Sequence, residues 1–206
     1  MNYFKVLSIT FCLVTSLVRI DAQTCKASVL TGLNAGQIDG DFEVGYNKLG
    51  LSAGIGIGVN IKPNMMISTE FLYSQRGSKN GLFRRDGVPN GSIRIDYISL
   101  PVVYKLYDWY QEDKEYYQVW IEGGIAPGRL ITANITGSDQ PELIEDFRTT
   151  DVSWLLGAGY HITENLFCSF RYTRSIAPFY VAENSGANDV QQFLSYFLTL
   201  RVGYQL

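Results

Sequence analysis

The stretch from Leu49 to Ile61 alternates strictly between two kinds of residue. Its odd positions hold Leu, Ala, Ile or Val, and its even positions hold Gly, Ser or Asn. Because Cβ atoms alternate across a β-strand, this pattern predicts a strand with one apolar face and one nearly bare face. Gly54, Gly56 and Gly58 recur every second residue and lack the third spacing of a dinucleotide-binding loop, so we reject a nucleotide site.

The same period of two recurs along the rest of the chain. Turn residues such as Pro63 and Asn64 separate the periodic segments. The expected strands cover about residues 27–38, 49–61, 65–76, 93–107, 116–129, 151–162, 166–176 and 193–206. Short connections at Lys62, Asp108–Glu115 and Thr163 alternate with long loops, which we place at 77–91, 130–147 and 177–192.

This arrangement predicts an all-β fold: an eight-stranded antiparallel up-and-down transmembrane β-barrel with short periplasmic turns and long outer loops. A length of 206 residues suits one domain, and 46% hydrophobic against 18% charged residues excludes a disordered chain. The net charge of −3 offers no basic surface for nucleic acid.

Residues 1–22 have the features of a secretory signal peptide. Lys5 supplies a positive charge, the mainly apolar Val6–Val18 follows, and Ala22 precedes a plausible cleavage point. The mature barrel domain would then be 23–206. It would retain Cys25 and Cys168, which form either two free thiols or, in an exported protein, a disulfide.

Alternation alone does not orient the barrel. A soluble lipocalin-like barrel buries its apolar face, whereas a membrane barrel turns that face to lipid. The other face here consists of Gly and Ser with isolated charges, unlike the charged surface of a soluble protein. Tyr and Trp also cluster at strand ends, as in membrane-interface girdles, at Tyr73, Trp154, Tyr160 and Tyr204. We therefore expect the cell outer membrane.

In that orientation seven charged side chains point into the lumen, where they avoid the cost of a charge in hydrocarbon. They are Glu70, Arg76, Lys105, Glu122, Asp151, Arg171 and Arg201. Because an eight-stranded barrel is just wide enough for side chains to fill, these groups would plug the lumen and pair with one another. The alternative is that they line a path for ions or solutes.

Several segments resemble the PorT-like outer-membrane β-barrel family of Bacteroidota. They are Leu33–Asp41, Tyr46–Gly54, Glu70–Ser78, Asp96–Lys105 and Leu200–Tyr204. The resemblance covers essentially the whole mature chain and implies a small barrel; the founding member belongs to a protein secretion and gliding apparatus. Two positions depart from the family pattern: the chain ends in Leu206 instead of Phe, and Ser99 replaces a common lumenal acidic residue.

We expect a non-enzymatic integral outer-membrane protein with no cofactor and no metal site. Its expected partners are outer-membrane lipid and the barrel-assembly machinery during biogenesis. The alternatives are an accessory component of a secretion or gliding apparatus, working with other envelope proteins, and a small-solute porin. An enzyme is disfavoured: His161 is the single His and lies at the periplasmic end, and Asp39 and Asp41 are typical of a turn.

Overall fold

The computed structural model describes residues 25–39, 48–79, 92–136, 148–178, 180–183 and 190–206, and these are all-β. The strands are β1 (Cys25–Asp39), β2 (Lys48–Lys62), β3 (Met65–Lys79), β4 (Ser92–Ser99), β5 (Val102–Gln111), β6 (Tyr116–Thr136), β7 (Thr150–His161), β8 (Leu166–Ser175), β9 (Tyr180–Glu183) and β10 (Val190–Gln205). Within the described ranges no helix is long and apolar enough to cross a membrane, a finding that bears on helices alone.

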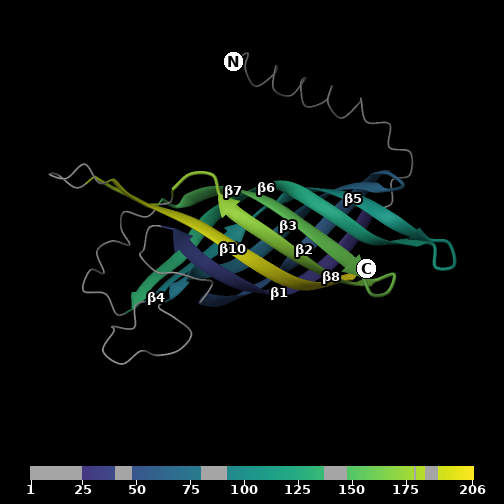
Figure 1. The fold of residues 1–206 in the computed structure, drawn as a ribbon, viewed down its shortest axis with the longest axis horizontal. Helices are drawn as coiled ribbons and strands as arrows, with labels where there is room; N and C mark the ends of the chain where they lie inside the picture. The colour runs from purple at the N-terminus through teal and green to yellow at the C-terminus, as the bar shows by residue number, and fades with distance from the viewer. Residues whose placement is uncertain (1–24, 40–47, 80–91, 137–147, 179, 184–189) are drawn as a thin grey trace, which may run out of the picture.

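The strands form one closed antiparallel barrel (Figure 1). Strands next to one another in the wall pair antiparallel, and β1 pairs with β10 to close the sheet, with Val29 opposite Tyr204 and Leu33 opposite Leu200. Closure leaves no exposed edge along the wall, which is the condition for a sheet to span lipid. The predicted eight-stranded barrel is therefore confirmed.

The ten described strands occupy eight positions in the wall, because two positions hold two strands each. β8 and β9 share one position, since both pair with β10. β4 and β5 both lie between β3 and β6, and Leu100-Pro101 separates them. Proline has no N–H to donate to the ladder, so the strand is interrupted there. The wall stays bonded across the interruption, since Glu70 N donates to Pro101 O at 3.0 Å and Leu100 N donates to Pro127 O at 2.9 Å.

The two ends of the barrel differ. At one, called the turn end below, the short connections 63–64, 112–115 and 162–165 lie with the last residue, Leu206, which bonds to Ala27. The strand ends that flank the long connections lie at the other, the loop end (Figure 1). Most residues of these connections, and the predicted signal peptide 1–22, lie outside the described part of the chain; the signal peptide stays a prediction.

The predicted long loops were too long. β3 continues to Lys79, β6 continues to Thr136, and β9 with the start of β10 occupies part of 177–192. Pairing explains the extension of β3: Gly77 to Lys79 lie opposite β4, with Lys79 against Ser92, and the backbone ladder holds these residues in a strand without an apolar stripe. The extension of β6 keeps the period of two, with Ile131 and Ala133 on one face, so its sequence already carried the signal of a strand. Similarly, β5 extends to Gln111 and shortens the predicted 108–115 connection.

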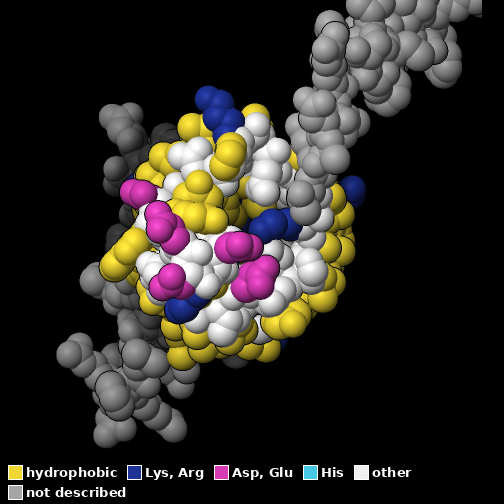
Figure 2. Space-filling view, turned by 90° about the vertical axis from the view of Figure 1, so that its right-hand side faces the viewer, with side chains coloured by type: hydrophobic (Ala, Val, Ile, Leu, Met, Phe, Trp, Pro, Cys, Tyr) yellow, Lys and Arg dark blue, Asp and Glu magenta, His cyan; other side chains and the backbone are white. Residues whose placement is uncertain are grey.

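The apolar stripe faces outward on most strands; β4 differs, with Ile95 and Tyr97 buried and Arg94 exposed. Leu51 on β2 is 58% exposed, whereas its neighbour Ser52 is 5% exposed. The same contrast recurs on β10, where Leu200 is exposed and Arg201 is buried. At the turn end, apolar side chains surround the rim and acidic side chains gather on the end face (Figure 2). The wall is therefore built for contact with acyl chains.

Placing a charge on this wall tests its orientation. Leu156 lies midway along β7 and is 57% exposed, so Leu156→Arg places a guanidinium in hydrocarbon. We expect it to lower the free energy of unfolding in lipid vesicles by about 2–4 kcal/mol, measured by urea titration. Ile162→Arg, at the turn end and 50% exposed, is the control and should change little. Equal effects of the two variants would contradict a lipid-facing wall.

Candidate functional site

A layer of four charged side chains crosses the lumen near its middle. Glu70, Glu122, Arg171 and Arg201 come from β3, β6, β8 and β10, and all four are nearly fully buried. Arg171 donates from Nη1 to Glu70 Oε2 at 2.8 Å and from Nη2 to Glu70 Oε1 at 3.0 Å. Its Nε donates to Glu122 Oε1 at 2.8 Å. One guanidinium thus bridges carboxylates from two separate strands.

Arg201 bridges the same two carboxylates from another direction. Its Nη1 donates to Glu70 Oε2 at 2.9 Å and its Nη2 donates to Glu122 Oε1 at 3.2 Å. Its Nε donates to Ser169 Oγ at 3.2 Å. Because each carboxylate receives hydrogen bonds from both guanidinium groups, the desolvation of the four charges is offset within the layer. We call these four residues the charged layer.

Glycines in the wall make space for the charged layer. A Cβ on Gly32 would lie 2.9 Å from Cγ of Arg201, and one on Gly157 would lie 3.0 Å from a carboxylate oxygen of Glu122. Both distances are shorter than ordinary van der Waals contact, so the bare positions let the long side chains lie along the sheet. The Gly-rich inner face is therefore a packing requirement.

A second ion pair lies toward the loop end. Arg76 Nη1 contacts Asp151 Oδ2 at 3.1 Å, and Ser153 Oγ donates to the same carboxylate at 2.8 Å. The guanidinium carbon lies 4.6 Å from the centre of the Tyr97 ring and 4.4 Å from that of Phe197. Two aromatic faces thus hold the cation in place through cation–π contacts.

Aromatic residues fill the lumen toward the turn end. Trp120 and Phe167 are buried and meet edge to face with ring centres 5.4 Å apart. Tyr107 and His161 pack against them, and His161 Nδ1 lies 2.8 Å from the carbonyl oxygen of Tyr117. Trp120 Nε1 donates to Glu122 Oε2 at 3.2 Å, which connects the aromatic group to the charged layer.

The structure places all seven predicted lumenal residues inside the barrel, but in two groups. Glu70, Glu122, Arg171 and Arg201 form the charged layer, with Lys105 Nζ at 4.0 Å from Glu122 Oε2. Arg76 and Asp151 form the separate pair. Sequence reasoning missed the aromatic group, although Trp120 is two residues from Glu122 and Phe167 is two from Ser169, so each shares the inward face of its strand.

Two small cavities, each about 20 Å³, flank the charged layer. One opens at the turn end; the other lies between the charged layer and Arg76. Each has room for about one or two waters. Among the described residues, no group of three His, Cys, Asp or Glu side chains is arranged to hold a metal ion. Both described cysteines, Cys25 and Cys168, are free thiols in the structure.

A closed barrel with an apolar wall outside and paired charges inside defines the class of outer-membrane β-barrel proteins. The sequence agrees: residues 22–181 match the model of the family described as outer membrane protein beta-barrel domain, and the chain belongs to that family. No curated protein matches the sequence.

Solved structures share the architecture at low sequence identity. Neisserial surface protein A is 18% identical with a TM-score of 0.51, and the match covers 86% of this chain and 96% of that one. The attachment invasion locus protein Ail of Yersinia pestis is 12% identical with a TM-score of 0.46, covering 88% of this chain and 98% of that one. The first likeness shows the shared barrel fold.

Removing one carboxylate tests how far the barrel depends on the charged layer. Glu70→Gln keeps the side-chain volume but leaves Arg171 and Arg201 short of a buried counter-charge, and we expect a loss of about 3–5 kcal/mol in the free energy of unfolding. The measurement is the urea midpoint of the refolded protein in detergent.

The matched control for Glu70→Gln breaks an ion pair of similar length outside the lumen. Arg94 Nη2 lies 2.9 Å from Asp96 Oδ2, but the Arg94 side chain is 49% exposed. Water screens that pair, so Arg94→Gln should leave the urea midpoint nearly unchanged. Equal midpoints for Glu70→Gln and the wild type would show that the charged layer contributes nothing to stability.

Proposed function

We propose that this outer-membrane barrel is non-enzymatic and non-conducting, and that its work is done by the segments that it displays at the loop end. The observation that carries the proposal is the charged layer. Its two guanidinium groups and two carboxylates bond across the lumen from four different strands, with distances of 2.8 to 3.2 Å. The side chains in the lumen thus hold the strands together, and the surfaces available to bind partners are the outer wall and the connections between strands.

The small-solute porin is the first alternative. Passage of a hydrated ion would require the bonds of the charged layer to break, because the cavities on its two sides hold only about 20 Å³ each. Water-filled channels belong to barrels with many more strands. A filled lumen therefore favours a scaffold over a pore.

Conductance across a planar bilayer tests the porin alternative. The wild-type protein should give no steady open-channel current, because the charged layer blocks the path, while a large water-filled porin inserted in parallel gives the positive control. Insertion is verified independently by the slower migration of the unheated, folded protein on a gel. A steady current from folded protein would overturn the non-conducting proposal.

The display role rests on the wall that supports the connections. Long connections join β3 to β4 and β6 to β7 at the loop end, and a rigid barrel holds their ends in place. In intact cells, protease should cut within residues 80–91 or 137–147 and leave the turn end intact. Cleavage confined to the turns at 112–115 and 162–165 would reverse the proposed orientation.

The chemistry of the described residues supports a non-enzymatic role. His161 is surrounded by rings, with Trp120 at 4.7 Å and Phe167 at 5.8 Å between ring centres, and its Nδ1 is bonded to a backbone carbonyl. These contacts fit packing better than proton transfer. The pair Asp39 and Asp41 lies outside the described side chains.

An accessory role in a secretion or gliding apparatus is the second alternative, which follows from the PorT-like resemblance. The expected partner during biogenesis is the barrel-assembly machinery. The expected partner of the inserted barrel is outer-membrane lipid, and the apolar outer wall supports that expectation. Pull-down from detergent-solubilised envelopes tests the accessory role: companions of the secretion apparatus should be recovered with the barrel. Recovery of the barrel alone would count against it.

A further inference from the structure

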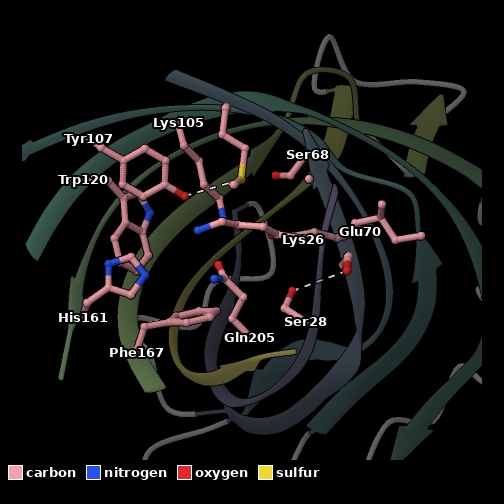
Figure 3. A pocket seen from close by; sticks show the side chains of 14 residues that line it. Lys26, Ser28, Ser68, Glu70, Lys105, Tyr107, Trp120, His161, Phe167 and Gln205 are labelled. Carbon is pink, nitrogen blue, oxygen red and sulfur yellow. Dashed lines mark hydrogen bonds between the residues drawn. The ribbon is translucent and has the colours of Figure 1, made fainter. Parts of the chain in front are cut away.

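We propose that the cavity at the turn end binds a small monovalent anion, of halide or carboxylate type, between the ammonium groups of Lys26 and Lys105. The cavity is separated from the segments displayed at the loop end, because the charged layer closes the lumen between them. Figure 3 shows Lys26, Lys105 and Gln205 extending into one space beside Trp120 and His161.

The balance of buried charge is the first argument. The charged layer contains two carboxylates and two guanidinium groups, and these four charges cancel. Lys105, 9% exposed, adds a further positive charge to the same interior. An uncompensated buried charge is unfavourable, and one further negative charge would balance the described side chains of the interior.

The position of the two ammonium groups is the second argument. Lys105 Nζ lies 4.0 Å from Glu122 Oε2, at the limit of a salt bridge and beyond hydrogen-bond distance. That carboxylate already accepts hydrogen bonds from Arg171, Arg201 and Trp120. Among the described residues no carboxylate forms a salt bridge with Lys26, which also lines the cavity. Within the described part of the chain neither ammonium group donates a hydrogen bond to a protein acceptor, and the remaining partner of Lys105 Nζ is aromatic, with the Trp120 ring centre at 5.6 Å.

An unpartnered buried hydroxyl is the third, independent observation. Ser68 on β3 is 5% exposed, its Oγ has no hydrogen-bond partner, and it lines the same cavity. A hydroxyl can donate to an anion where it finds no protein acceptor. Gln205, which also lines the cavity, brings an amide group from the last strand. The cavity thus combines two cations with neutral donors.

Glu70 also lines the cavity and would repel an anion if its charge were free. Both of its oxygens, however, accept hydrogen bonds from guanidinium groups: Oε1 from Arg171, and Oε2 from Arg171 and Arg201. Its charge is compensated within the charged layer. Lys26 and Lys105 are therefore the residues that bring uncompensated charge to the lining of the cavity.

The volume of the cavity limits the class of ligand that it can bind. A cavity of about 20 Å³ accommodates a halide or the carboxylate group of a small acid. It is too small for a phosphate ester, a nucleotide or a sugar. The ligand class is therefore a single compact monovalent anion that enters from the turn end.

The test measures unfolding of the refolded full chain in zwitterionic detergent at constant ionic strength, with sodium chloride exchanged for sodium gluconate. Gluconate is too large for the cavity. Because a ligand that binds the folded state stabilises it, chloride should raise the unfolding midpoint of the wild type by roughly 2–5 °C. Lys105→Met should abolish this dependence on chloride. Lys62→Met, at the exposed β2–β3 turn, should retain it.

The unfolding midpoint of Lys105→Met in gluconate distinguishes a lysine that binds an anion from a lysine that serves only the structure. In the proposed case this variant balances the interior charge without an anion, so its midpoint in gluconate equals or exceeds that of the wild type. A lysine needed only for its contact with Glu122 would instead lower the midpoint equally in both salts. That result, or equal chloride dependence in all three proteins, would overturn the proposal.

A direct measurement covers the case in which Lys105→Met does not refold. Crystals of the wild type grown in bromide should show an anomalous peak between Lys26 and Lys105, and an empty cavity would overturn the proposal. Replacing chloride with formate then shows whether the cavity accepts carboxylates as well as halides. Stabilisation by chloride alone supports a halide site, and stabilisation by both supports a site that also accepts carboxylates.

Discussion

The double bridge of Arg171 and Arg201 across Glu70 and Glu122 is the interaction on which the rest of the barrel depends. A wall that faces lipid on the outside leaves only its inner face for polar groups, and eight strands enclose too little space for a solvated interior. The charges of the charged layer therefore neutralise one another directly. The four side chains do so with six hydrogen bonds to one another or to Ser169.

Apolar residues face outward and polar residues face inward, the reverse of a soluble protein, and this distribution explains the composition of the strands. In β2 the outward residues are large and apolar, while the inward residues are small because inward side chains of the neighbouring strand lie over them: a Cβ on Gly54 would be 2.8 Å from the side chain of Leu72. Gly32 and Gly157 show the same requirement beside Arg201 and Glu122. Size therefore alternates along a strand for two reasons: lipid contact on one side, and space for long polar side chains on the other.

Much of this architecture follows from the sequence because its period of two is set by backbone geometry. The strand at 49–61 and the inward direction of Arg171 and Arg201 depend only on which residues are odd and even. The strand ends could not be predicted in this way. The continuation of β3 to Lys79 depends on pairing with β4, and the grouping of Arg76 with Asp151 depends on which strands lie opposite, which no local pattern encodes.

The charged layer is complete only when β10 is in place, because β10 carries Arg201. Arg201 contacts Glu70 across 131 positions of the chain, and it stands on the strand that closes the barrel against β1. This contact requires β10 and β3 to occupy their places in the closed wall. Circular closure and completion of the ionic interior are therefore a single event, and a polypeptide cut short before β10 would have neither an edge-free wall nor a finished interior.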